Sequence, residues 1–275
     1  MTTKQTHKEF LNRQGVWERI YTKQYYTYLQ GVNNAIAKEI EKNGLVVDVV
    51  SFLNEDRLIA IFKRLYQRVT LSEAKIEYES LLNIKKKDLI EDFINFFATL
   101  DDGSMPVQLW RTVLKDFVTV RISSRISYIN ETTRKHITDI IQKGLDEGLG
   151  ALDVARLIRN DRQFNRNRAL AIARTETVTA ANQGKYMAAL SSPYVTEKKW
   201  IPTLDARTRI SHLQMQQVPW IPLTQNFNLV NAKGVLEEAQ YPCAGTLSAS
   251  NTVNCRCVIV TRAAKDENGK LIRKR

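Results

Sequence analysis

The chain has 275 residues, 43% of them hydrophobic and 25% charged, so it can build one large or two ordinary globular domains. Forty-one lysine and arginine residues against 29 acidic ones give a net charge of +12, which favours a polyanionic partner such as nucleic acid over a basic protein without one. The N-terminus lacks the apolar core of a signal peptide, and no apolar run approaches 18 residues. We therefore expect a soluble protein with no membrane segment, made in the cytoplasm.

Helical periodicity dominates the first half of the chain. Apolar side chains recur every three or four residues over 10–42 and 54–82, and again over 106–126 and 129–145. An apolar segment at 89–100 lies between the two pairs. We expect a mostly helical region at 1–148, which resembles no family that we can name.

After three glycines at positions 144, 148 and 150, which suggest a hinge, the pattern changes. A short helix is predicted at 151–160 and a long one at 168–190, where small residues at intervals of three or four would let another backbone approach closely. A strand at 194–200, a helix at 205–217 with Asp205 near its N-cap, and short β segments at 218–223, 227–230 and 254–261 follow. The sequence thus predicts an α+β fold, with a C-terminal domain at 149–262 whose long central helix packs on a small β-sheet, and a basic flexible tail at 263–275.

The densest group of cationic side chains precedes the central helix. It contains one acid, Asp161, among the arginines Arg156, Arg159, Arg162, Arg166 and Arg168. Guanidinium groups bind phosphates without reading bases, so these residues predict sequence-independent contact with double-stranded DNA.

The central helix also carries many polar residues for a helix that the small side chains would bury. Because buried polar groups need partners, we expect a polar network that holds the helix to the sheet. Its predicted members are Arg174, Glu176, Asn182, Asp205 and Arg207. The alternative is a surface helix whose polar groups face water, with Asp205 a simple cap and His212 a core residue.

The three cysteines lie close together in the sequence, at Cys243, Cys255 and Cys257. If Arg256 is on a strand, the thiols on either side of it point the same way. Together with His212 they offer a Cys₃His set for a tetrahedral zinc ion, although the spacing is not that of a standard zinc finger. The alternative is that the cysteines pack as small apolar residues.

Several motifs taken in order resemble the phage Mu F-like family of head morphogenesis proteins. They are Ile172-Ala-Arg-Thr-Glu-Thr with Ala181-Asn182, Trp200, Asp205-Ala-Arg-Thr-Arg with His212, Pro242, and Asn254-Cys-Arg-Cys257. The resemblance covers roughly residues 130–260. One departure concerns Cys243, which stands where the family more often has a Gly–Asp type of turn, and Asp205 is then the alternative fourth metal ligand.

This resemblance implies a minor head protein of a tailed bacteriophage that is not an enzyme. Such a protein would associate with the portal inside the head, touch packaged DNA, and meet scaffold or major capsid protein during assembly in the host cytoplasm. The alternative is an enzyme, a nuclease or an ADP-ribosyltransferase-like protein, using Arg174 and Glu176 with Asp205 and His212. The sequence contains no phosphate-binding glycine motif and no standard hydrolase motif that would favour it.

Overall fold

The computed structural model describes residues 3–82 and 105–274, so the apolar segment predicted at 89–100 lies outside the described residues. The chain divides into two compact units. The first unit comprises Met1–Gly15, Leu65–Asp116 and Arg174–Arg275, and the second comprises Val16–Arg64 and Phe117–Ala173. The glycine hinge predicted near residue 148 lies within the second unit, and the domain boundary predicted there stays a prediction.

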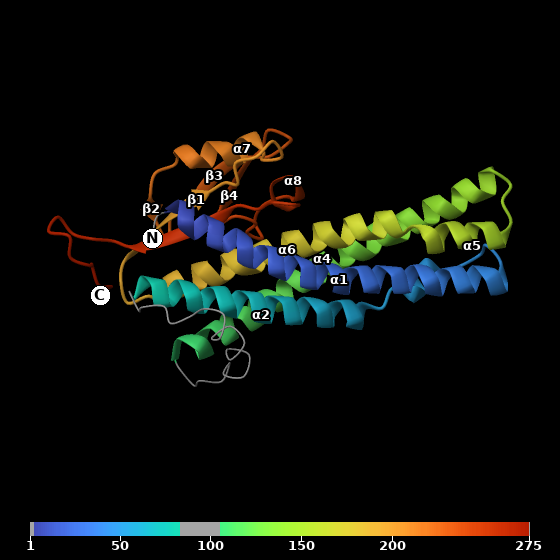
Figure 1. Ribbon diagram of the computed structural model, residues 1–275, viewed down its shortest axis with the longest axis horizontal. Coiled ribbons are helices and arrows are strands. Elements are labelled where there is room, and N and C mark those ends of the chain that lie inside the picture. Colours follow the sequence, from blue (N-terminus) through green and yellow to red (C-terminus); the bar gives the residue numbers. More distant parts are fainter. Residues whose placement is uncertain (1–2, 83–104, 275) are drawn as a thin grey trace. The chain divides into compact units, whose positions relative to one another are not determined.

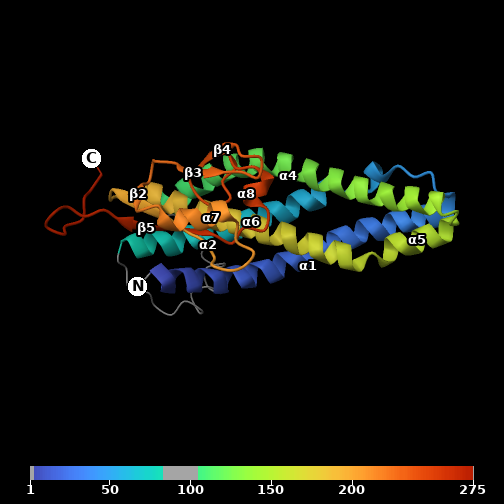
Figure 2. The same cartoon turned by 90° about the horizontal axis from the view of Figure 1, so that it is seen from above.

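The second unit consists of helices and their connections, and helical segments also form part of the first unit. Their bounds are α1 Thr3–Asn43, η1 Val49–Phe52, α2 Glu55–Leu81, α4 Met105–Asp146, α5 Ala151–Asn160 and α6 Arg162–Ser191. In the second unit, α5 lies along α1, as both views show, and Asn33 Nδ2 donates to the carbonyl of Ile158 at 2.9 Å (Figures 1 and 2). Aromatic side chains fill the space between α1 and α2, where Tyr25 meets Phe62 edge to face. Apolar burial therefore holds this unit together.

The first unit adds the β structure to its helical segments. Its elements are β1 Thr196–Ile201, α7 Ile210–Gln214, η2 Met215–Gln217, β2 Ile221–Pro222, β3 Phe227–Val230, β4 Leu236–Ala239, α8 Ala249–Thr252 and β5 Val258–Ala263. An antiparallel sheet has the order β2-β1-β5, with Trp200 opposite Ile259, and β3 pairs with β4 in a hairpin. Trp200 is fully buried in a core shared with Phe227 and with Val178 of α6.

The part of α6 from Arg174 to Ala189 is buried on nearly every side, and a close backbone contact with α2 explains its small residues. A Cβ atom on Gly184 would lie 2.2 Å from the carbonyl oxygen of Thr70 and 3.0 Å from the amide nitrogen of Ala74. Glycine is thus required for this approach. Beside it, the buried ammonium of Lys185 lies 2.5 Å from a Glu77 carboxylate oxygen.

The predicted α+β class is confirmed, and so is a long central helix beside a small sheet. Three details differ. The helix predicted from Asp205 begins only at Ile210 and has Arg209 as its N-cap, because Asp205 accepts the Arg207 amide in a turn. The strand β4 was not predicted, since its Leu-Glu-Glu-Ala sequence has little β propensity and gains its order by pairing with β3.

The third difference is at the C-terminus. Residues predicted as a loose tail form backbone hydrogen bonds with the segment before β1. The Val195 amide donates to the Ile272 carbonyl at 2.8 Å, and the Lys274 amide donates to the Pro193 carbonyl at 2.9 Å. A short bridge between Lys265 and Leu271 folds the tail back on itself.

Candidate functional site

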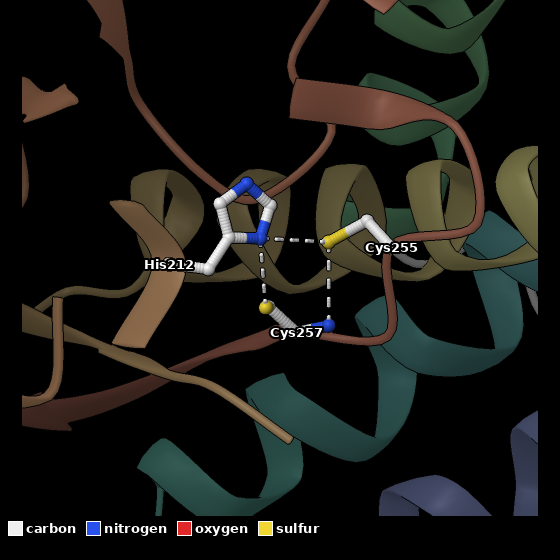
Figure 3. A group of neighbouring side chains, drawn as sticks. All are labelled: His212, Cys255 and Cys257. Carbon is white, nitrogen blue, oxygen red and sulfur yellow. Dashed lines mark hydrogen bonds between the residues drawn. The ribbon is translucent and has the colours of Figure 1, made fainter. Parts of the chain in front are cut away.

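Two cysteines and a histidine meet in the interior of the first unit (Figure 3). The Nδ1 atom of His212 lies 3.3 Å from the Cys257 sulfur and 3.7 Å from the Cys255 sulfur. All three ligand atoms lie within 4.8 Å of one another, and each side chain is at most 2% exposed. The site is therefore a compact group of soft ligands shielded from water.

The local backbone before β5 and at α7 places the three candidate ligands. The Asn-Cys-Arg-Cys segment precedes β5 instead of lying on it, so the predicted strand at 254–261 begins four residues later, at Val258. Asn254 adopts a left-handed conformation (φ 59°), which asparagine tolerates, and this turns the following chain inward. The Cys257 amide donates to the Cys255 sulfur at 3.4 Å. On the other side, α7 presents His212, whose ring meets the buried Trp200 ring edge to face.

Polar side chains of α6 fix the backbone of the cysteine segment. Asn182 donates to the Cys257 carbonyl at 3.0 Å and accepts the Ile259 amide at 2.9 Å. About two turns earlier along α6, the Thr175 hydroxyl accepts the Asn254 amide at 3.0 Å, and Arg174 reaches the Asn254 side chain at 3.4 Å. The polar residues of the central helix therefore position the thiols.

Cys243 lies beside the cluster without belonging to the group of three. Its thiol donates to the Thr252 carbonyl at 3.6 Å, a long contact, and it also hydrogen-bonds with the Cys255 thiol. That bond and burial raise the pKa of Cys255 well above its usual value. The pKa of Cys257 is raised as well, by its hydrogen bond with Cys255 and by burial. As free thiols, these groups hold their protons.

The predicted polar network is divided among separate contacts. Glu176 is 3% exposed and accepts the Tyr66 hydroxyl at 2.5 Å, so it fastens α6 to α2. The prediction was wrong in placing Asp205 and Arg207 in a buried network, because both are exposed on the loop before α7. There Asp205 pairs with Arg256 at 2.6 Å, and the hydrogen bond from that guanidinium lowers the carboxyl pKa. Asp205 is also not in the group of clustered ligand atoms.

The predicted phosphate-binding arginines differ in how far they are engaged within the protein. Arg168 is half-buried and donates to the hydroxyls of Thr132 and Thr133, so a structural contact already occupies its guanidinium. Arg156 pairs with Asp153 and Arg159 with Glu41, both at the surface. The side chains of Arg162 and Arg166 are exposed.

Sequence reasoning missed the neighbours of Arg166. In the second unit, this residue lines an open pocket of about 490 Å³ together with Arg19 and Lys23 of α1. One acid, Glu18, also lines the pocket, with Thr22, Tyr26 and Leu170. Arg19 and Lys23 are exposed and one helical turn apart, an arrangement found on most helix surfaces, and therefore nothing in the sequence singled them out.

Comparison with known proteins agrees with the class of protein that these motifs define. Residues 135–260 match the family model described as phage Mu protein F like protein. The matched segment, a little under half of the chain, contains the cysteine–histidine cluster and most of the α6 residues that fix it. The predicted resemblance to the phage Mu F-like family of head morphogenesis proteins is confirmed over this segment.

Two curated relatives extend over more of the chain. An NAD(+)–arginine ADP-ribosyltransferase EFV of Enterococcus faecalis is 25% identical over 220 residues, which cover 76% of this chain and 44% of that protein. The uncharacterized protein YqbB of Bacillus subtilis is 22% identical over 248 residues, covering 88% of this chain and 74% of that protein. The chain thus spans less than half the length of the enterococcal relative. No solved structure matches. Within the described residues, no helix combines the length and apolar character needed to cross a membrane.

Proposed function

We propose that this protein is a minor component of the phage head, associated with the portal inside the shell and in contact with packaged DNA. The observation that carries the proposal is the match of residues 135–260 to the phage Mu F-like family, which supports a role in head morphogenesis. The net charge of +12 supports a location beside DNA, because a strongly basic protein is drawn to a polyanion. Portal protein is the proposed main partner, with scaffold or major capsid protein as further contacts during assembly in the host cytoplasm.

The DNA contact is proposed to involve exposed cations of the second unit. The sequence suggested Arg156, Arg159, Arg162, Arg166 and Arg168. Exposure favours Arg162 and Arg166, and the pocket adds Arg19 and Lys23. Arg168 is better understood as a structural residue, since its guanidinium is hydrogen-bonded within the unit.

A role without catalysis fits the cluster geometry better than the enzyme alternative. Arg174, Glu176, Asp205 and His212 would have to surround a common substrate. Instead, Glu176 is buried against Tyr66, and His212 is buried against the thiols. Asp205 is paired at the surface with Arg256. The activity in the enterococcal relative's name belongs to a protein of which this chain spans 44%, so it gives no separate reason to propose that activity here.

Particle composition tests the head assignment. Procapsids and DNA-filled virions would be purified, treated with protease, and probed for this chain by quantitative mass spectrometry. We expect a few copies per particle, protected from protease in both and lost from particles assembled without portal. Absence from both particles, or complete digestion by external protease, would contradict an internal head protein.

Salt dependence tests the DNA contact independently. The protein should bind duplexes of unrelated sequence equally, with log affinity falling linearly against log salt by roughly 0.9 for each phosphate neutralised. Arg166→Gln combined with Arg19→Gln should reduce that slope by about 1 to 2. Arg262→Gln is the matched control, because this exposed arginine already pairs with Glu197. An unchanged slope in the double variant would remove the pocket from the interface.

A further inference from the structure

We propose that the cysteine–histidine cluster binds one structural zinc ion through His212, Cys255, Cys257 and Cys243. This inference stands apart from the proposed role in the phage head, because it rests on four side chains of the first unit and on no partner. It answers a question that the sequence left open, namely whether Cys243 or Asp205 completes the ligand set.

The distances within the cluster match those that zinc requires. In a tetrahedral site with Zn–N of about 2.0–2.1 Å and Zn–S of about 2.3 Å, a nitrogen and a sulfur ligand lie about 3.6 Å apart. The two observed distances from His212 Nδ1, 3.3 and 3.7 Å, fall on either side of this value. The three ligands therefore need only small adjustments to surround an ion.

The surrounding contacts support the sulfurs as anionic ligands. The Cys257 amide points its N–H at the Cys255 sulfur, an arrangement that stabilises a thiolate. Asn182 holds the Cys257 carbonyl on the far side, which keeps this backbone from turning away. The imidazole presents Nδ1 to both sulfurs (Figure 3), and its ring packs edge to face against the buried Trp200 ring. Ligands fixed in this way lose little freedom when a metal binds.

Cys243 is the fourth ligand on two grounds. Its thiol already contacts the thiol of Cys255, so a rotation away from the distant Thr252 carbonyl would bring it toward the ion. Its backbone is also held in the left-handed region, at φ 63°, where a residue with a Cβ atom is unfavourable and glycine or asparagine is usual. A bond from this thiol to a metal would offset the conformational cost of a cysteine at this position. Asp205 is excluded, because it is exposed and paired with Arg256.

The protons and charges of the site can be counted for zinc binding. Binding Zn²⁺ releases the three thiol protons to solvent, and the imidazole coordinates as a neutral ligand, so the loaded site has a net charge of −1. Arg256 lies between the two cysteines in sequence, and Arg209 donates to the Val253 carbonyl at 2.6 Å. Because Arg256 pairs with Asp205, these three side chains together add a net charge of +1 beside the cysteine segment. Four protein ligands leave no position for a substrate, which makes the role structural.

Metal analysis of the full-length protein tests the proposal. Protein purified without chelator, or reconstituted with zinc after reduction, should contain about one zinc per chain. Removing the zinc with a chelator should lower the melting temperature by about 5–10 °C or more. Cobalt should replace zinc and give the visible bands of tetrahedral thiolate coordination. Below about 0.2 zinc per chain after reconstitution, with no shift in melting temperature, the cysteines are core packing and the proposal is wrong.

Variants identify the ligands. Cys257→Ser should weaken zinc binding at least about 100-fold, whereas His7→Gln, a change at a histidine of the same unit outside the cluster, should leave it unchanged. Cys243→Ala keeps the same backbone requirement, so any loss of affinity reports on the thiol. We expect a loss of about 100-fold together with altered cobalt bands. Full affinity and an unchanged spectrum in Cys243→Ala would overturn the four-ligand site. If a variant does not fold, the zinc affinity of the wild-type protein is measured instead, by competition with a chromophoric chelator.

Discussion

Two buried polar clusters lie against α6 in the first unit, and they differ in how their buried polar groups find partners. The charged cluster contains Arg13, Glu73, Glu77 and Lys185, two cations and two anions that neutralise one another. The thiol cluster contains Cys255, Cys257 and His212, with Cys243 beside it, and each of these side chains can donate an electron pair to a metal ion. Burial demands partners for polar groups in both cases. The charged cluster is complete within the chain, whereas the thiol cluster is suited to an added cation.

The two clusters together explain why α6 carries polar residues over a long stretch. Lys185 and Gly184 face α2, where the helix is in close contact with backbone. Asn182 and Thr175 contact the cysteine segment. One helix therefore supports both clusters, and its polar residues are fixed by partners on two sides.

The largest expected effect comes from breaking the charged cluster. Lys185→Met leaves the buried carboxylates of Glu73 and Glu77 without their shared ammonium. Removing one partner of a buried pair costs roughly 3–5 kcal/mol, and urea unfolding should show this loss. Lys143→Met is the control, because that lysine is 76% exposed and should change stability by less than about 0.5 kcal/mol. A loss below about 1 kcal/mol for Lys185→Met would mean that water reaches the cluster.

A second change disturbs the helix contact on which the charged cluster depends. Gly184→Ala places a methyl group 2.2 Å from the Thr70 carbonyl oxygen, so the two backbones must separate. We expect a loss of about 1–3 kcal/mol in the free energy of unfolding. Gly31→Ala on α1 provides the matched control, since its nearest neighbour is the end of the Arg57 side chain at 3.8 Å. It should be neutral or slightly stabilising, because alanine favours helix.

Asn182→Ala tests whether α6 supports the proposed zinc site. The substitution leaves the Cys257 carbonyl and the Ile259 amide without their partner, at a cost of about 1–3 kcal/mol for such buried groups. The zinc affinity should fall about 10–100-fold, as for other residues that orient ligands. Thr177→Ala, in the same buried stretch of α6, should leave zinc affinity unchanged. Equal zinc affinity in both variants would remove Asn182 from the site.

The smallest expected effect is at Asp205. Asp205→Asn should leave the zinc content at its wild-type value, because this carboxylate belongs to the exposed pair with Arg256. Its pKa in the folded protein is lowered, so its contribution to stability is present above the unfolded pKa, near 3.9, and is lost as the pH falls through the folded pKa. Any difference in melting temperature between wild type and variant should therefore be small at pH 7 and vanish in acid. A loss of zinc would restore Asp205 as a ligand.

The sequence predicted the fold where one physical pattern dominated. Helical periodicity predicted a helix over residues 10–42, within α1, a short helix was predicted at the bounds of α5, Ala151–Asn160, and a β segment at the bounds of β3, Phe227–Val230. The start of α7 was misplaced, because the seven-residue interval from Asp205 to His212 fits two helical turns as well as a turn followed by a short helix. Local spacing does not distinguish these.

The candidate site was predictable in its residue types but not in its arrangement. Two cysteines separated by one residue, a third upstream and the histidine at position 212 suggested a metal site, and the fold brings three of those side chains together. The positions of Glu176 and Asn182 depended on which segment covers each face of α6. That information comes from Tyr66, more than 100 residues away, and from the segment before β5. Contacts of this kind leave no spacing signal in one sequence.

Zinc-edge X-ray absorption on the full-length protein tests the central claim, a metal held by the thiol cluster, most directly. The account predicts three sulfur ligands at about 2.3 Å and one nitrogen ligand at about 2.0–2.1 Å. Cys243→Ala should change the fit to two sulfurs, whereas Asp205→Asn should leave it unaltered. A site dominated by oxygen ligands, or zinc too scarce to give a signal after reconstitution, would contradict the account.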